Sequence, residues 1–236
     1  GSSLGSEWRA LKELRAAEDL RHERSDLVPA IAEGFGQLLD RQSPSEIQRP
    51  RIRYILSAGR HLLNLINEVL DISRIESGTL QLSLEPVCIE EAISEALDLM
   101  RPLASERNIT LGPGASLETT TFVLADRQRL KQVLLNLLSN AVKYTAVEGS
   151  VAIEFVESPP FTRISVRDTG AGIAVEKLAR LFTPFDRLGA EQSPVEGTGL
   201  GLALCQRLIH AMNGTIGVNS TLGDGSTFWL ELPQAE

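Results

Sequence analysis

The sequence predicts an α+β protein in which a helical hairpin is followed by a two-layer α/β sandwich. The first observation is that residues 1–78 carry apolar side chains at steps of three and four, the period of an α-helix. The second is that short strand-like runs begin after Leu80 and are interleaved with amphipathic helical runs. We therefore expect two domains, residues 1–78 and residues 79–236.

The helical hairpin is expected to dimerise. One apolar stripe runs from Trp8 to Leu38, and the segment S-P-S-E-I-Q-R-P at 43–50 interrupts the pattern. A second stripe runs from Ile52 to Leu70, and Leu65 and Ile72 add apolar surface on another side of that helix. Two helices joined by a short loop cannot cover apolar faces this broad. Pairing with a second copy would form a four-helix bundle that buries these faces, so the sequence predicts a homodimer.

The second domain is expected to place a layer of helices on one face of a mixed sheet. Its helices are predicted at 89–105, 127–143 and 199–212, with a short one at 175–181. Its strands are predicted at 108–111, 121–125, 150–157, 161–167, 214–219 and 226–232. The run V-A-I-E-F-V, followed by S-P-P and F-T-R-I-S-V-R, is typical of a β-hairpin.

Composition excludes some classes of function. The net charge of −8 and the pI of about 5.1 argue against a nucleic-acid partner, which usually calls for a basic surface. No apolar run approaches the ~20 residues that cross a bilayer, and no secretory signal is visible. Cys88 and Cys205 are expected to be buried thiols in helical surroundings. We therefore expect a cytoplasmic protein with no membrane segment in this chain.

Three sequence runs, each about thirty residues from the next, indicate a nucleotide site. They are N-L-L-S-N-A-V-K-Y-T at 136–145, D-T-G-A-G-I at 168–173 and E-G-T-G-L-G-L at 196–202. In the first, Asn136 and Asn140 share a helix face with Lys143 one turn further on. Asn oxygens suit Mg²⁺ and a Lys suits phosphate. The alternative is an ordinary amphipathic helix with exposed polar residues.

The two glycine runs suggest how a base and its phosphates could be held. Asp168 ends a strand, so its carboxylate could accept a hydrogen bond from an exocyclic amine such as that of adenine. Gly170 and Gly172 would let the backbone approach a flat base, although a solvated Asp in a turn is the alternative. The glycines at 197–201 precede a helix whose free N–H groups would face phosphate. The alternative there is a flexible loop with a helix cap.

Together with F-T-P-F-D-R at 182–187, these runs resemble four motifs of sensor histidine kinases, in family order. Residues 136–145 resemble the N box, 168–173 the first G box, 182–187 the F box and 196–202 the second G box. The second domain is thus similar to their ATP-binding domain, the GHKL (Bergerat) ATPase fold. The resemblance implies ATP and Mg²⁺ as cofactors, with Asn140 coordinating the metal and Asn136 assisting. It implies that Lys143 and Tyr144 reach the phosphates and ribose. The further residues it implies at the nucleotide site are Asp168, Gly170, Gly172, Ile173, Phe185, Gly197, Thr198, Gly199, Leu200 and Gly201, with an ATP lid at 187–196 supported by Phe182 and Phe185.

The helical part resembles the dimerisation and histidine-phosphotransfer domain of the same family. Residues 58–78 are close to its second helix, and R-H-E-R-S-D-L-V-P-A-I at 21–31 corresponds to its H box, with His22 and Glu23 at matching offsets. Helical geometry turns His22 toward water, and Glu23 could hold one ring nitrogen. Arg24 stands where the family has a buried aliphatic residue. His22 is therefore either the phosphoacceptor or a solvated surface histidine.

The resemblance implies an ATP-dependent protein-histidine kinase. It would phosphorylate His22 and pass the phosphoryl group to an aspartate of a response-regulator receiver domain. One alternative is a dimeric ATP-binding pseudokinase or scaffold with a degenerate H box. Another is a GHKL ATPase of the mismatch-repair or chaperone type, against which the F box and the helical hairpin argue. Asp26 stands where many family members carry a Thr or Asn that aids dephosphorylation, so phosphatase activity is not predicted.

Overall fold

A computed structural model describes residues 48–114, 120–187 and 197–235. The chain divides into two units, residues 1–70 and 71–236. The first predicted helix, with His22 and Glu23, lies outside the described residues. Helix α2 (Gln48–Glu76) runs across the division, so the predicted boundary after Gly78 stays a prediction. Among the described residues, no helix combines the length and apolar character needed to cross a membrane.

Helix α2 confirms the second predicted helix and ends at Glu76, immediately before Ser77 and Gly78. The N–H of Ser77 donates to the Ser73 carbonyl at 3.0 Å, and that of Gly78 to the Ile75 carbonyl at 3.1 Å. Gly78 has a φ of +67°, a conformation that Gly adopts without steric cost and that commonly closes a helix. Within the first unit, Tyr54, Ile55, Leu62 and Val69 of α2 are exposed large apolar side chains.

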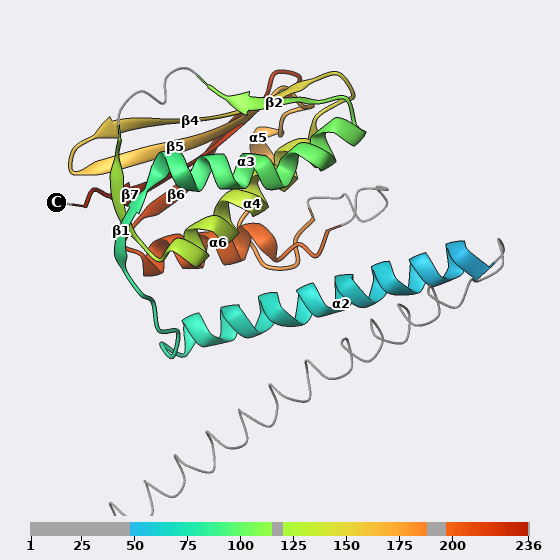
Figure 1. Cartoon of the computed structure of the whole chain (residues 1–236), viewed down its shortest axis with the longest axis horizontal. Coiled ribbons are helices and arrows are strands. Elements are labelled where there is room, and N and C mark those ends of the chain that lie inside the picture. Colours follow the sequence, from blue (N-terminus) through green and yellow to red (C-terminus); the bar gives the residue numbers. More distant parts are fainter. Residues whose placement is uncertain (1–47, 115–119, 188–196, 236) are drawn as a thin grey trace, which may run out of the picture. The chain divides into compact units, whose positions relative to one another are not determined.

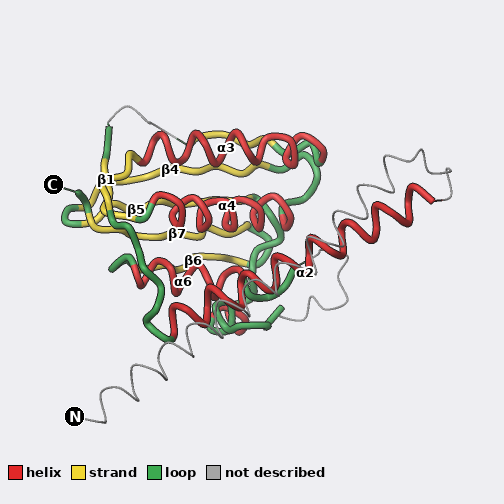
Figure 2. The backbone as a smooth tube through the Cα atoms, turned by 60° about the horizontal axis from the view of Figure 1, so that its bottom comes forward, coloured by secondary structure: helices red, strands yellow, loops and turns green. Residues whose placement is uncertain are grey.

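The second unit has helices on one face of a five-stranded mixed sheet (Figures 1 and 2). The strand order is β2 (Thr110–Pro113), β4 (Ser150–Ser158), β5 (Phe161–Asp168), β7 (Gly225–Pro233) and β6 (Thr215–Thr221). Strands β2 and β4 are parallel and the other pairs are antiparallel. The covering helices are α3 (Ile89–Glu106), α4 (Arg127–Tyr144) and α6 (Gly201–Ala211). The predicted two-layer α/β fold and its β4–β5 hairpin are confirmed.

Alternation along the strands builds the core between the two layers. Ile153, Ile164, Val166 and Leu230 are buried, while their neighbours in sequence face the other side of the sheet. The three helices each contribute a buried apolar stripe to the same cluster. Apolar burial of this kind is the main force that fixes the helices on the sheet.

A second, two-stranded sheet was not predicted. Strand β1 (Glu85–Cys88) pairs antiparallel with β3 (Phe122–Ala125), so the strand expected at 121–125 does not join the mixed sheet. Strand β1 was missed because four residues are too few to show a clear alternation, and local pattern cannot reveal which sheet the strand at 121–125 joins. The expectation for Cys88 was also wrong: this half-buried residue ends a strand, whereas Cys205 is buried in α6, and both are thiols.

Backbone conformation explains the shifted element boundaries. The helix predicted from residue 199 begins at Gly201, because Gly199 has a φ of +74°. The strand predicted from residue 108 begins at Thr110, because Asn108 has a φ of +53°. Neither positive φ value fits a regular helix or strand. The short helix α5 (Val175–Leu178) ends three residues before its predicted end.

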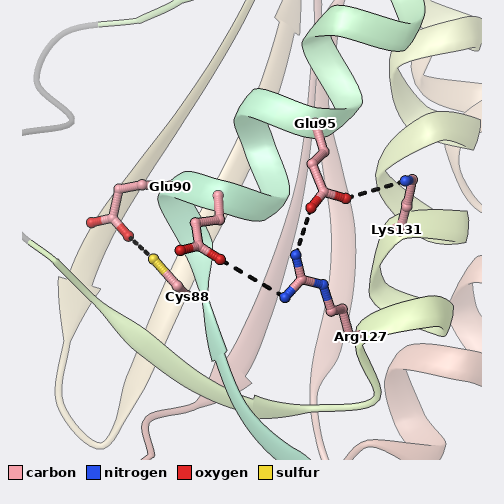
Figure 3. Close-up of polar contacts among 6 residues, drawn as sticks. Cys88, Glu90, Glu95, Arg127 and Lys131 are labelled. Atoms are coloured by element: carbon pink, nitrogen blue, oxygen red, sulfur yellow. Dashed lines mark hydrogen bonds and ion pairs between the residues drawn. The ribbon is translucent and has the colours of Figure 1, made fainter.

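Ion pairs on the surface join α3 to α4 (Figure 3). Glu95 of α3 lies 2.5 Å from the Arg127 guanidinium and 3.1 Å from the Lys131 ammonium of α4. Hydrogen bonds from these two cations hold the pKa of the Glu95 carboxyl below its usual value. Because the groups are exposed, the pairs contribute little to the free energy of folding. They join side chains that lie opposite one another on α3 and α4.

Candidate functional site

Helix α4 carries the first predicted part of the site. Asp126 precedes the helix as its N-cap, and its carboxylate accepts a hydrogen bond from the Arg129 N–H at 3.0 Å. One side of the helix is buried in the core by Leu130, Val133, Leu134, Leu137 and Leu138. The half-buried Asn136 and Asn140 share another side, as their spacing predicts. The Nδ2 of Asn140 donates to the Oδ1 of Asn136 at 3.1 Å, which leaves the Oδ1 of Asn140 available as a ligand.

Arg107 fixes the end of this helix and was missed by the sequence analysis. Its Nη1 donates to the carbonyl oxygens of Val142 at 2.8 Å and Lys143 at 2.7 Å, and its Nη2 donates to the Thr145 carbonyl at 3.4 Å. These are carbonyls that a helix terminus leaves without intrahelical partners. A guanidinium there also complements the negative end of the helix dipole. Arg107 thereby holds the turn that presents Lys143 and Tyr144.

Asp168 is the last residue of β5 and its side chain is buried. The Gly170 N–H donates to the Oδ1 of Asp168 at 2.8 Å, and the Ser226 N–H also donates to the carboxylate. Burial raises the pKa of this carboxyl, and the two backbone hydrogen bonds oppose the rise. A solvated turn residue would be exposed, so that alternative is wrong. A buried carboxylate with few protein partners is suited to accept a hydrogen bond from a ligand.

The glycines of the first G box are packed too closely for any side chain. A Cβ at Gly170 would lie 2.6 Å from the Tyr144 carbonyl oxygen, so this glycine abuts the end of α4. A Cβ at Gly172, which has a φ of +66°, would lie 1.9 Å from the Thr221 carbonyl oxygen. The first G box therefore lies between the N box and the β6–β7 turn.

The F box and the second G box are joined through their backbones. The Phe185 N–H donates to the Gly199 carbonyl at 2.9 Å, and both residues have positive φ values. A Cβ at Gly199 would lie 2.9 Å from the carbonyl carbon of Phe185. Phe185 is exposed, whereas the half-buried Phe182 packs against the core. Of the lid predicted at 187–196, residues 188–196 lie outside the described residues.

The second G box also reaches the N box. A Cβ at Gly201 would lie 2.2 Å from the Nδ2 of Asn136, so the first residue of α6 lies against the first Asn of α4. The Leu200 N–H donates to the Oγ1 of Thr198 at 3.1 Å, and the Leu200 side chain is buried. Gly197 is exposed and has open space around its Cβ position. The four sequence motifs thus meet in one region of the second unit.

Two serines complete this region and were not predicted. The Ile173 N–H donates to the Oγ of Ser220 at 2.8 Å, and this hydroxyl lies 2.9 Å from the Oγ of the buried Ser226. A polar residue at a buried strand position is the only local signal that could have singled out Ser226.

Within the described ranges, no cluster of His, Cys, Asp and Glu could hold a metal ion.

Comparison with known proteins places these motifs in a family. Residues 125–236 match the family described as "Histidine kinase-, DNA gyrase B-, and HSP90-like ATPase". A Caulobacter vibrioides protein named "Non-motile and phage-resistance protein" is 42% identical over 184 residues, covering 76% of this chain and 22% of its own length. The "Circadian input-output histidine kinase CikA" of Synechococcus elongatus is 38% identical over 202 residues, covering 85% of this chain and 26% of its own length.

The solved structures agree. Full-length ShkA, crystallised in complex with AMPPNP, has a TM-score of 0.78 and 36% identity, covering 94% of this chain and 46% of ShkA. This chain belongs to the sensor histidine kinases. It carries their GHKL ATP-binding domain. The matches to sensor histidine kinases extend beyond the ATPase domain, since they cover more of the chain than residues 125–236. The chain spans about a quarter of the length of the two curated relatives, 22% and 26%.

Proposed function

We propose that this sensor histidine kinase chain is the core of an ATP-dependent protein-histidine kinase. The observation that carries the proposal is the meeting of the four motifs, above all the contact of Gly201 with Asn136 and the hydrogen bond between Phe185 and Gly199. Together with the close approach of Gly170 to the end of α4, these contacts bring a helix N-terminus, two Asn side chains and a buried carboxylate into one region. That combination suits a nucleotide better than any other common ligand.

The nucleotide would be held along its whole length. Asp168 would accept a hydrogen bond from the adenine amine, with Gly170, Gly172 and Ile173 beside the base. Lys143 and Tyr144 would reach the phosphates and ribose. The phosphates would meet backbone N–H groups at the start of α6, which complement negative charge. The residues proposed there are Gly197, Thr198, Gly199, Leu200 and Gly201, with Phe185 supporting the segment that covers the nucleotide.

The donor set fits a magnesium ion. Asn140 would be the ligand through its Oδ1, and Asn136 would assist, since the hydrogen bond between the two amides orients them. Few protein ligands suffice, because Mg²⁺ in nucleotide sites is usually held by one or two side chains, the phosphates and water. The ion would neutralise charge that develops on the phosphates.

The acceptor would be His22. One of its ring nitrogens would attack the γ-phosphorus of ATP, so that an N–P bond forms while the bond to the bridging oxygen breaks and ADP leaves. Glu23 would hold the other ring nitrogen and raise the nucleophilicity of the first. A receiver-domain aspartate of a response regulator would then accept the phosphoryl group.

The homodimer and the cytoplasmic location are part of this proposal. The exposed apolar side chains of α2 support pairing with a second copy in a four-helix bundle. ATP as phosphoryl donor supports a cytoplasmic location.

Nucleotide binding tests the ATP site directly. Asp168→Asn should weaken ATP binding by about 1.5–3 kcal/mol, the usual cost of losing a hydrogen bond to a charged group. Asn140→Ala should remove the dependence of ATP binding on Mg²⁺. Asn219→Ala is the matched control, because Asn219 is exposed on β6 outside the proposed site. If Asp168→Asn and Asn140→Ala bind Mg²⁺·ATP like the unmodified chain, these roles are wrong.

A further inference from the structure

The turn between β6 and β7 packs against the first G box. The Gly223 N–H donates to the Ala171 carbonyl at 2.8 Å, and the Thr221 carbonyl oxygen occupies the place where Gly172 would carry a Cβ. The loop after Asp168 therefore takes its shape partly from a turn about fifty residues later in the chain. At such a contact, a single side chain can control the position of the loop.

Ser220 makes three hydrogen bonds at this contact. Its Oγ accepts from the Ile173 N–H at 2.8 Å, donates to the Gly225 carbonyl at 2.9 Å and lies 2.9 Å from the Oγ of Ser226. A hydroxyl has one proton and two lone pairs. Because the proton goes to Gly225, the Ser226 hydroxyl must donate to Ser220. The Ser220 hydroxyl is then saturated, and each bond has a fixed direction.

The hydrogen bonds of Ser220 connect two segments next to Asp168: the start of β7 and the loop that follows Asp168. Ser226 is the register partner of Asp168 across the β5–β7 pair, and its N–H bonds the Asp168 carboxylate. A Cβ at Gly225 would lie 2.1 Å from the Asp168 carbonyl oxygen. Ser220 thus ties the strand segment beside Asp168 to the loop that follows Asp168, through Ile173.

We propose that Ser220 is a positioning residue that aligns the Asp168 carboxylate with the amino group of an adenine base. The proposal rests on the proposed role of Asp168 in ATP binding and names a residue that acts through Asp168 and Ile173. Without the Ser220 hydroxyl, the Ile173 N–H and the Ser226 hydroxyl lose their common partner. The loop can then shift, and the contact with the amine weakens more than the contacts with ribose and phosphate.

The test compares two nucleotides on the whole chain: Mg²⁺·ATP, and Mg²⁺·purine riboside triphosphate, in which hydrogen replaces the 6-amino group. Binding is measured by calorimetry. Ser220→Ala should bind ATP about tenfold more weakly, as expected for one hydrogen bond. It should bind the analogue within about twofold of the unmodified chain, because the analogue lacks the amine that the hydroxyl helps to align.

Thr215→Ala is the matched control. Thr215 lies on the same strand, and its hydroxyl donates to the Glu231 carboxylate at 3.0 Å on an exposed part of the sheet. This variant should bind both nucleotides normally. Thermal unfolding checks that Ser220→Ala is folded. If it is not, Ser220→Cys keeps the shape, replaces the hydroxyl with a weaker hydrogen-bonding group and should give the same selective loss.

Equal weakening of both nucleotides by the Ser220 variant would mean a merely structural role and would overturn the proposal, as would unchanged binding of both. Asp168→Asn separates this failure from that of the proposed function. If Asp168→Asn abolishes the preference for ATP over the analogue while the Ser220 variant keeps it, only the Ser220 proposal fails. If Asp168→Asn keeps the preference, the adenine role of Asp168 fails and the Ser220 proposal fails with it.

Discussion

The guanidinium of Arg129, at the start of α4, lies 2.9 Å from the carboxylate of Asp71, in the last turns of α2. The same carboxylate oxygen accepts a hydrogen bond from the Nε2 of Gln132 at 3.2 Å. Only 20% of the Arg129 side chain and 12% of the Asp71 side chain are exposed. Ile72 and Ile75 pack against the core beside them. The end of α2 is therefore an integral part of the second unit.

Asp71→Ala should lower the free energy of unfolding of the second unit by about 2 kcal/mol, because it leaves the mostly buried Arg129 without its charge partner. Urea unfolding followed by Trp229 fluorescence, in a chain with Trp8→Phe, measures this. Glu76→Ala is the control. It removes a pair with Arg207 at 2.6 Å in which Glu76 is 59% exposed. It should cost less than about 1 kcal/mol. Equal effects of the two variants would contradict this interpretation.

Arg107→Ala should loosen the C-terminal end of α4. Three carbonyls lose a charged donor, so we expect a loss of about 2 kcal/mol in stability together with weaker ATP binding through Lys143 and Tyr144. Arg107→Lys should recover only part of both losses, because an ammonium lacks the planar fork of a guanidinium. Arg101→Ala removes an exposed pair with Asp98 and should change neither quantity. Normal ATP binding by a folded Arg107→Ala variant would show that the end of α4 does not need this cap.

Gly201→Ala should separate binding from stability. The added Cβ would meet the end of the Asn136 side chain, which can rotate away, so the free energy of unfolding should change by less than about 1 kcal/mol. The displaced Asn136 would lose its hydrogen bond to Asn140, and Mg²⁺·ATP binding should fall about tenfold. Gly112→Ala is the control, since a Cβ there meets open space. Calorimetry measures the Mg²⁺·ATP affinity of both variants. Equal affinities would refute a role in nucleotide binding for the close contact between Gly201 and Asn136.

ATP binding should also depend on the ionisation of Asp168. Burial raises the pKa of this carboxyl, and the amine contact needs the ionised form. Affinity should therefore fall as the pH drops through the raised pKa, beginning at a higher pH than for an ordinary Asp. ATP itself titrates identically in experiments on the unmodified chain and on Asp168→Asn. The ratio of their ATP dissociation constants at each pH therefore isolates the effect of ionising the Asp168 carboxyl. A ratio that stays constant from neutral pH down to the acid limit of folding would contradict the prediction.

Local sequence pattern predicted the parts of the fold and site that local physics determines. The apolar spacing of α4 fixed which side of the helix is buried, and therefore placed Asn136 and Asn140 together. The glycine runs marked Gly172 and Gly199, where positive φ and close approach exclude a Cβ. Both signals lie within a few residues of the feature they predict.

Contacts between distant segments could not be predicted in this way. Arg107 meets carbonyls 35 to 38 residues later in the chain, and Ser220 binds an N–H 47 residues earlier. No periodic pattern in the sequence around Arg107 or Ser220 indicates partners so far away along the chain. The pairing of β1 with β3 is a distant contact of the same kind: the strand at 121–125 was predicted, but its short partner β1 and the sheet they form were not.

The most direct test of the kinase proposal is incubation of the chain with Mg²⁺ and ATP labelled at the γ-phosphate. We compare the unmodified chain with His22→Gln, and with His61→Gln and His210→Gln as controls for the two other histidines. The proposal predicts an acid-labile, base-stable label that is lost only in His22→Gln. No label on the unmodified chain despite measurable ATP binding, or label that survives His22→Gln, would contradict it.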